Sequence, residues 1–304
     1  MEHTIPAPQL LPARFVGLDI GGSKTRGMVW TSGSVTGDAT VGSTNVQNVS
    51  AAVAAENLAA LFAALDCAGA LEVFVGAGGI DTDDDAAALR RLISPLVPGA
   101  QVTVVHDTRL LLAAAGYTEG TAVIAGTGSA AWGINAAGEQ ARAGGWGYLL
   151  GDEGSGYWLG REAVRHSLRR MDAGNAVDPL TSELLRHCQL QAPGELIAHF
   201  HGGTSRRYWA AASAVVVAAA DAGHAPARAM LDRAADFLAG LAEAVAVQLQ
   251  LSAPVVLGGG LGSNVPALQD AFTKALAERG MHQVHILRQD PILGIPLLVA
   301  GRGH

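Results

Sequence analysis

Residues 15–30 read Phe-Val-Gly-Leu-Asp-Ile-Gly-Gly-Ser-Lys-Thr-Arg-Gly-Met-Val-Trp. The apolar run Phe15–Ile20 predicts a β-strand that ends at Gly21-Gly22, and Thr25–Trp30 predicts a second strand directly after this turn. Two strands that are joined by a short glycine turn form a β-hairpin, to which Val35–Val41 would add a third strand. This part of the chain is therefore expected to be antiparallel sheet.

Helices and strands alternate after the hairpin, and the pattern then starts again. Helices are expected at 51–65 and 83–92, and strands at 71–77 and 101–106. A second pair of strands follows at Thr121–Ala125 and Ala130–Ile134, again separated by glycines. Two copies of this mixed arrangement predict two related α/β domains.

The expected domains are residues 1–116 and 117–304. The second domain carries a helical insertion at roughly 152–251, in which long helices are expected at Asp152–Arg170 and Ser205–Ala222. The last helix, at 291–301, is expected to pack back on the first domain.

Composition excludes several classes of protein. The chain has 304 residues, of which 49% are hydrophobic, so it is long enough for two domains with real cores. The net charge of −7 gives no global field for binding nucleic acid or an anionic membrane. Residues 1–14 lack the pattern of a targeting segment, and the two cysteines cannot form a disulfide framework. We therefore expect a cytoplasmic protein without nucleic-acid or membrane partners.

Three glycine-rich turns are expected after apolar strands. Glycine lets backbone N–H groups converge on an anion, and a neighbouring hydroxyl adds a donor. A single turn of this kind usually only closes a hairpin, but three of them favour a polyphosphate ligand. The predicted phosphate-binding residues are Gly21, Gly22, Ser23, Lys24 and Thr25 in the first turn, Gly126, Thr127, Gly128 and Ser129 in the second, and Gly258, Gly259, Gly260 and Ser263 in the third.

Two common nucleotide motifs do not fit these turns. No Gly-x-x-x-x-Gly-Lys-[Ser/Thr] sequence occurs, so the chain lacks a Walker-type loop. A dinucleotide fingerprint would join a strand to a helix, whereas the turns at Gly21 and Gly126 each lead into another strand. His199, His201, His282 and His285 also lack the partners of a zinc site.

Carboxylates lie at the ends of predicted strands. Asp19 would either hold Mg²⁺ beside the phosphates of a nucleotide or accept hydrogen bonds from the turn. Asp107 follows the strand at 101–106 and would be either an ordinary helix N-cap or a general base that takes a proton from an attacking alcohol. Asp152 is open to the same N-cap interpretation. Trp146 lies among glycines, where its ring could cover the C–H face of a polyol.

Together these motifs resemble the N-acetylglucosamine kinase-like family, which includes the BadF/BadG activating ATPases and belongs with the sugar kinases, actin and the heat-shock chaperone ATPases. The most specific stretch is Gly144-Gly-Trp-Gly-Tyr-Leu-Leu-Gly-Asp-Glu-Gly-Ser-Gly-Tyr-Trp-Leu-Gly-Arg-Glu-Ala163. It is supported by Leu18–Thr25, Ala125–Ser129 and Leu257–Pro266, in the order of the family.

The resemblance implies two ribonuclease-H-like domains of the actin-like ATPase fold, which close over ATP, Mg²⁺ and a hexose. The first two glycine turns would bind phosphates, Gly258–Ser263 would flank the adenosine, and Asp19 would lie toward Mg²⁺. Asp107 would be the base that activates the 6-hydroxyl of the sugar. The positions that match sugar contacts are Asn45, Thr127, Gly145, Trp146 and Asp152, and Gly78–Asp81 corresponds to a loop that faces the cleft.

The implied reaction is phosphorylation of N-acetylglucosamine by ATP to give the 6-phosphate, in a protein that is expected to be a homodimer. Cys67 and Cys188 do not match the cysteines with which activating ATPases of the family hold an iron–sulfur cluster. The chain also lacks the cysteine-rich zinc loop of a related glucokinase group. A kinase for glucosamine or another amino sugar, and a sensor without catalysis, remain as alternatives.

Overall fold

The computed structural model describes residues 11–46, 48–80 and 82–301. The described residues form two compact units. Unit 1 holds the residues up to Thr118 together with those from Gln289 onward, and unit 2 spans Glu119–Arg288. The sequence analysis also made predictions for residues 1–10 and Asp81. These residues lie outside the described part of the chain.

Unit 1 contains a five-stranded mixed sheet with the order β3-β2-β1-β4-β5. The first three strands pair antiparallel, and β1, β4 and β5 pair parallel. The strands are β1 (Arg14–Ile20), β2 (Lys24–Thr31), β3 (Ser34–Gly42), β4 (Glu72–Ala77) and β5 (Gln101–His106).

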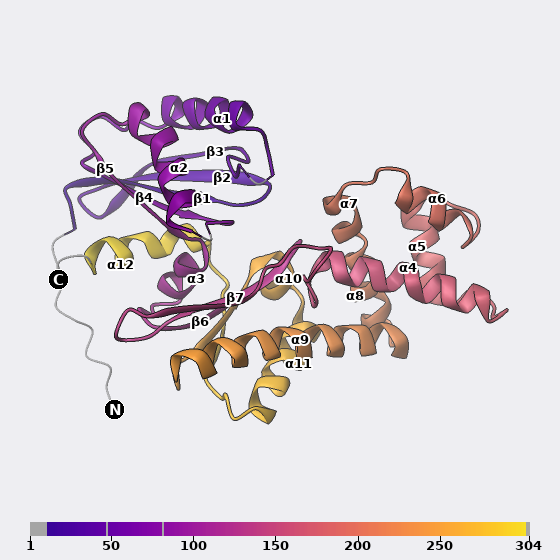
Figure 1. The fold of residues 1–304 in the computed structure, drawn as a ribbon. Coiled ribbons are helices and arrows are strands. Elements are labelled where there is room, and N and C mark those ends of the chain that lie inside the picture. Colours follow the sequence, from indigo (N-terminus) through magenta and orange to yellow (C-terminus); the bar gives the residue numbers. More distant parts are fainter. Residues whose placement is uncertain (1–10, 47, 81, 302–304) are drawn as a thin grey trace. The chain divides into compact units, whose positions relative to one another are not determined.

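Helices cover both faces of this sheet (Figure 1). On one face, α1 (Ala51–Ala64) and α2 (Asp83–Ile93) pack on side chains such as Val16 and Leu18. The other face carries α3 (Thr108–Ala114) and α12 (Ile295–Ala300), preceded by a 3₁₀ turn at Pro291–Gly294. Side chains alternate between the two faces of a strand, so Phe15, Gly17 and Asp19 all point toward the α3 and α12 side.

Unit 2 contains a second five-stranded sheet, with the order β10-β9-β6-β7-β8. Here β6, β7 and β8 pair antiparallel, and β6, β9 and β10 pair parallel. The strands are β6 (Gly120–Ala125), β7 (Ser129–Ile134), β8 (Gln140–Gly144), β9 (Val255–Gly258) and β10 (Val284–Ile286). The two mixed sheets with their helices confirm the predicted α/β class.

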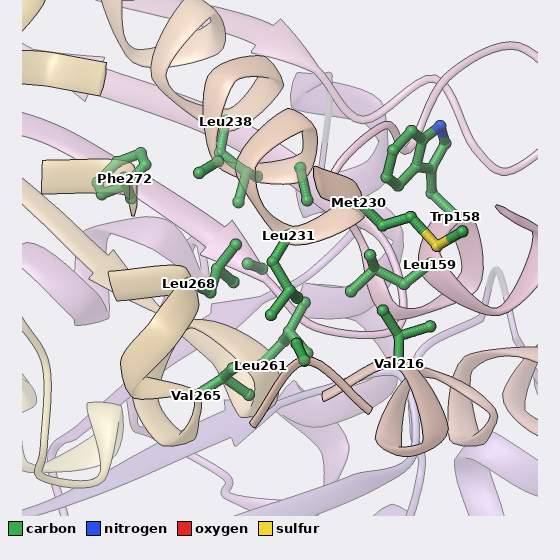
Figure 2. Close-up of a cluster of buried hydrophobic side chains, with 14 of the residues drawn as sticks. Trp158, Leu159, Val216, Met230, Leu231, Leu238, Leu261, Val265, Leu268 and Phe272 are labelled. Carbon is green, nitrogen blue, oxygen red and sulfur yellow. The ribbon is translucent and has the colours of Figure 1, made fainter. Parts of the chain in front are cut away.

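The helices of unit 2 share one large apolar core. Figure 2 shows side chains from several of them meeting, among them Leu159, Leu231 and Phe272, which are fully buried. Burial of this apolar surface, rather than helix propensity, holds the helices on the sheet. The helices are α4 (Gly156–Asp172), α5 (Pro179–Cys188), α6 (Glu195–His201), α7 (Arg206–Ala211), α8 (Ser213–Asp221), α9 (Ala225–Leu249), α10 (Gly259–Asn264) and α11 (Pro266–Glu278).

The structure corrects three sequence predictions in unit 2 and adds one strand that was not predicted. The helix expected from Asp152 begins only at Gly156, and the helix expected at 205–222 is divided into α7 and α8 at Ala212. The third glycine segment is the short helix α10 rather than an open turn. The strand β8 was not predicted, because Gln140–Gly144 is short and half-exposed and only two alanines form its apolar side.

Within the described ranges, no helix has the length and apolar character that are needed to cross a membrane.

Candidate functional site

Three parallel strands of unit 1 bring predicted site residues to one edge of the sheet. The carboxyl ends of β1, β4 and β5 lie side by side, since Gly78 N donates to Ile20 O at 3.1 Å and Asp107 N donates to Ala77 O at 3.1 Å. Ligands of open α/β sheets commonly bind at such an edge. Asp19, Gly78 and Asp107 are placed there by the topology alone.

Asp19 is a half-buried carboxylate among other carboxylates. Burial raises its pKa from 3.8 to about 7, and the negative charges of Asp107 and Asp290 add to this shift. The positive charges of Lys24 and Arg26 act in the opposite direction. A group of acidic side chains in this setting is suited to a divalent cation with oxygen ligands.

Asp290 belongs to this acidic group but was not predicted. Its Oδ2 accepts a 2.7 Å hydrogen bond from Arg26 Nη1, and its Oδ1 accepts from the N–H of Ile292. Arg26 also binds Asp38 through two of its nitrogens. In the sequence, Asp290 before Pro291 indicates only a helix N-cap, so nothing connected it with Asp19.

Asp107 is the N-cap residue of α3, but its side chain makes no capping hydrogen bond. Its Oδ1 is buried without a hydrogen-bond partner, although His106 Nδ1 lies 3.0 Å away. Its Oδ2 would lie 3.0 Å from a Cβ added to Gly78, and Asn45 Nδ2 donates to Gly78 O at 2.9 Å. The structure therefore brings Asp107, Asn45 and Gly78 together.

The first glycine turn is an exposed hairpin corner. Gly21 N donates to Lys24 O at 3.0 Å, and residues 22–24 are exposed. Thr25 differs from them, because it is fully buried and its hydroxyl is hydrogen-bonded to Thr44 Oγ1 at 2.9 Å. The backbone and side chains of residues 22–24 are thus available to a ligand, whereas the hydroxyl of Thr25 is used inside the protein.

In unit 2, the second and third glycine segments meet where the parallel strands β6 and β9 end. Gly259 has a φ of 87°, and a Cβ there would lie 2.6 Å from Ala125 O, so only glycine allows this approach. Gly258 is buried at the end of β9, while a Cβ on Gly260 would meet no atom within 4 Å. Ser263 lies on α10 and its carbonyl accepts from Arg288 Nη1 at 3.2 Å.

Asp152 is the centre of the second group of predicted residues. It is 3% exposed and has a φ of 64°, a left-handed conformation that is uncommon outside glycine and is found at functional sites. Burial raises its pKa, and the N–H of Ser129, which donates to Oδ1 at 3.2 Å, lowers it. The N-cap of α4 is Ser155, so the N-cap interpretation of Asp152 is wrong.

Arg206 of α7 forms an ion pair with this buried carboxylate. Its Nη2 lies 3.0 Å from Asp152 Oδ2. A Cβ on Gly128 would lie 2.3 Å from the same Nη2, so glycine at 128 leaves the room that the pair occupies. Arg206 was not predicted, since it lies 54 residues from Asp152 in an Ala-rich helical region. Only the fold reveals the pair.

Gly145 and Trp146 lie next to the second glycine turn. Gly145 N donates to Ser129 O at 3.1 Å, and the guanidinium of Arg142 stacks on the Trp146 ring at 4.9 Å. The Trp146 side chain is 63% exposed. Thr127 is exposed as well, while the hydroxyl of Ser129 donates to Glu153 O at 2.7 Å.

The predicted residues therefore form two groups, one in each unit. Unit 1 gathers Asp19, the first glycine turn, Asn45 and Asp107. Unit 2 gathers the second and third glycine segments with the residues proposed for sugar contact, namely Thr127, Gly145, Trp146 and Asp152.

A separate histidine cluster lies among the helices of unit 2. Asp178 Oδ2 contacts His166 Nε2 at 2.7 Å and His224 Nε2 at 3.1 Å, with Arg170 Nε at 3.5 Å. Asp178 is also the N-cap of α5. These contacts join α4, α5 and the start of α9, and the nearby arginine disfavours a cation there.

The chain matches the model of the BadF/BadG/BcrA/BcrD ATPase family over residues 16–295. An N-acetylmuramic acid/N-acetylglucosamine kinase of Clostridium acetobutylicum is 32% identical over 209 residues, which are 67% of this chain and 68% of that protein. An N-acetyl-D-glucosamine kinase of Dictyostelium discoideum is 29% identical over 237 residues, 74% of each chain.

Solved structures agree with this match. The crystal structure of a candidate N-acetylglucosamine kinase from Chromobacterium violaceum is similar with a TM-score of 0.75 and 26% sequence identity. The alignment covers 96% of this chain and 100% of that one. The likeness confirms the predicted actin-like ATPase fold.

Proposed function

The chain belongs to the BadF/BadG/BcrA/BcrD ATPase family, and from this membership we propose that it is an ATP-dependent sugar kinase. Its proposed reaction is transfer of the γ-phosphoryl group of ATP to the 6-hydroxyl of N-acetylglucosamine. The names of the two curated relatives support an acceptor of this class.

The observation that carries the proposal is the position of Asp107. This carboxylate lies at the end of a parallel strand, does not cap its helix, and has an Oδ1 without a hydrogen-bond partner. A carboxylate with unused acceptor capacity can accept the proton of a sugar hydroxyl. Asn45 and Gly78, which lie beside it, would help to orient the sugar.

The residues of unit 1 also fit a magnesium-bound nucleotide. The carboxylate of Asp19 offers oxygen atoms of the kind that Mg²⁺ prefers as ligands. Its raised pKa indicates that a positive charge beside it would be favourable. Gly21, Gly22, Ser23 and Lys24 would contact phosphate oxygens through N–H groups and the lysine ammonium. Mg²⁺, when bound, would neutralise charge on the phosphates.

In unit 2, residues 126–129 would contact the phosphates. The adenosine would be flanked by Gly258, Gly259, Gly260 and Ser263. The exposed ring of Trp146 would cover the apolar face of the sugar. Gly145 and Asp152 would form hydrogen bonds with the polar groups of the sugar. These roles rest on the family resemblance and on the clustering described above.

In the proposed reaction, the oxygen of the sugar 6-hydroxyl attacks the γ-phosphorus of ATP while Asp107 accepts the proton of this hydroxyl. Phosphoryl transfer passes through a loose transition state, so the orientation of this hydroxyl contributes more than the basicity of Asp107. We also propose a homodimer that acts in the cytoplasm, which sedimentation and cell fractionation would test.

Coupled ADP release tests the function. N-acetylglucosamine, glucosamine, glucose and N-acetylmannosamine are compared as acceptors, and phosphorus NMR of the product identifies the modified hydroxyl. We expect the highest kcat/KM with N-acetylglucosamine and a 6-phosphate product. Preference for glucosamine would correct the acceptor, and sugar binding without ADP release would indicate a sensor instead of a kinase.

The variant Asp107→Asn tests the role of the base. It keeps the size and polarity of the side chain but cannot accept the proton, so we expect kcat to fall by about 10²–10⁴-fold. Sugar binding, measured by calorimetry, should change less than about threefold. Near-normal turnover would remove Asp107 from this role and leave the kinase assignment to the acceptor assay.

A further inference from the structure

We propose that Asp290 is a positioning residue of the nucleotide site, which holds the guanidinium of Arg26 and thereby keeps the carboxylate of Asp19 free for a cation. This inference rests on the proposed function, in which Asp19 lies toward Mg²⁺. All three residues belong to unit 1, which includes the segment from Gln289 onward. The inference gives this last segment of the chain a role beyond packing.

Asp19 and Arg26 are directly opposite residues of the antiparallel strands β1 and β2. Opposite residues of such a pair point to the same face of the sheet, with Cβ atoms about 5 Å apart, and opposite charges at these positions stabilise the sheet. Within the described ranges, however, Asp19 takes part in no hydrogen bond or ion pair. The ion pair that the strand register favours is therefore not formed.

The guanidinium of Arg26 is engaged by two other carboxylates. Its Nε and Nη2 donate to the two oxygens of Asp38 at 3.0 and 2.6 Å, which is the bidentate geometry that suits a carboxylate. Its remaining nitrogen, Nη1, donates to Asp290 Oδ2 at 2.7 Å. Because Asp38 occupies the other edge of the guanidinium, Nη1 is the group that could turn to Asp19, and Asp290 is the residue that competes for it.

Asp290 is held in place by its own segment. Its Oδ1 accepts from the N–H of Ile292 at 3.3 Å, and Asp290 is the N-cap of the 3₁₀ turn at Pro291–Gly294. Ile292 and Ile295 are fully buried in the core on this face of the sheet. The side chains of Arg26 and Asp290 are each 27% exposed, so their ion pair is less screened by water than a surface pair.

Loss of the carboxylate at position 290 would change the partner of Arg26. A guanidinium N–H that is left unbonded in a half-buried position is unfavourable, so Nη1 would turn to another acceptor. The acceptor that the strand register places opposite is Asp19. An ion pair between Asp19 and Arg26 would use the oxygens that the proposed function assigns to Mg²⁺.

The variant Asp290→Asn tests this role. Asparagine can still cap the turn through its oxygen, but it carries no charge to hold Arg26. Binding of ADP is measured by calorimetry at pH 8, with and without Mg²⁺. We expect the Kd for ADP with Mg²⁺ to rise by about tenfold or more, as for other residues that orient metal ligands. The Kd without Mg²⁺ should not rise, because the variant has less negative charge beside the phosphates.

A crystal structure of Asp290→Asn tests the geometry directly. We expect Nη1 of Arg26 to lie at hydrogen-bond distance from a carboxylate oxygen of Asp19, about 3 Å. Thermal unfolding verifies that the variant is folded. Asp290→Ser, whose hydroxyl can also cap the turn, takes its place if the asparagine variant does not fold.

Asp38→Asn is the matched control, because it removes one carboxylate from the same guanidinium while Asp290 still holds Nη1. Its Kd for ADP with Mg²⁺ should stay within about twofold of the wild-type value. The double variant Arg26→Gln/Asp290→Asn has no guanidinium that could bind Asp19, so the affinity for ADP with Mg²⁺ should return. A double variant as weak as Asp290→Asn would overturn the proposal, because Asp290 would then contact the metal itself.

The outcomes separate this inference from the proposed function. Turnover of N-acetylglucosamine by the wild-type protein, together with an Arg26 that stays away from Asp19 in Asp290→Asn, would overturn the inference alone. Equal losses in Asp38→Asn and Asp290→Asn, or wild-type ADP binding that does not depend on Mg²⁺, would also overturn it. Failure of the wild-type protein to phosphorylate any sugar would overturn the proposed function, while the position of Arg26 in the variant would still decide the role of Asp290.

Discussion

Asp19 makes the stability of the protein depend on pH. Its pKa is about 7 in the folded protein and 3.8 in the unfolded chain, because burial and two nearby carboxylates disfavour its charge. Between these values the folded state holds a proton that the unfolded chain has released. The free energy of unfolding therefore falls as pH rises from about 4 to 7, and the loss is complete above that range.

The variant Asp19→Asn removes this titration. We expect it to be about as stable as the wild-type protein at pH 4 and more stable at pH 8 by on the order of 2 kcal/mol. Denaturant unfolding without Mg²⁺ at both pH values measures the difference. Asp270→Asn on the surface of α11 controls for the loss of one charge. A pH profile of Asp19→Asn that parallels the wild type would contradict the assignment.

Residues at the ends of strands were the predictable part of the site. Asp19 and Asp107 each follow an apolar run, and parallel pairing of β1, β4 and β5 brings such positions together. Arg206 and Asp290 could not be predicted, because each meets its partner only after distant segments have packed. No local pattern distinguishes such residues from ordinary surface charges.

At the level of elements, α4 and α7 approach each other through a glycine. A Cβ on Gly160 would lie 2.0 Å from Trp209 O, so Gly160→Ala must push α7 away from α4. We expect a loss of about 2 kcal/mol or more in the free energy of unfolding. Because Arg206 begins α7, the same variant should weaken the pair with Asp152 and raise KM for the sugar.

Gly240→Ala is the matched control for this prediction. Gly240 lies inside α9, and a Cβ there would meet no atom within 4 Å. Alanine has the higher helix propensity, so this variant should gain up to about 1 kcal/mol. Equal effects of the two substitutions, measured by denaturant unfolding, would show that the contact between α4 and α7 is not tight.

The class of most elements was predictable, while several boundaries were not. Asp152 followed by Glu153 is a common helix start, yet Asp152 and Gly154 adopt left-handed conformations and the hydroxyl of Ser155 caps α4. The carboxylate of Asp152 is needed by Ser129 and Arg206 instead. Contacts with distant residues decide between two possible caps, and the sequence alone does not contain them.

At the level of the whole molecule, the chain returns to unit 1 after completing unit 2. Asp290 binds Arg26, and Ile292, Ile295 and Val299 pack on the face of the first sheet that also carries α3. The partners of an apolar six-residue helix cannot be read from its own residues.

The returning segment should be required for the stability of unit 1 in particular. Ile295 is fully buried, and its Cδ1 would lie 2.6 Å from a Cβ on Gly17. Ile295→Ala removes buried methyl groups and leaves a cavity, so we expect a loss of about 2–4 kcal/mol in the free energy of unfolding.

Native-state hydrogen exchange of this variant should show faster exchange in β1, β2 and α3 and unchanged protection in α9, because the two units have separate cores. Leu293→Ala, at a side chain that is 42% exposed in the same segment, should leave both patterns within error. Equal loss of protection in α9 would mean that the two units unfold together, and unchanged exchange in β1 would mean that the segment does not stabilise unit 1.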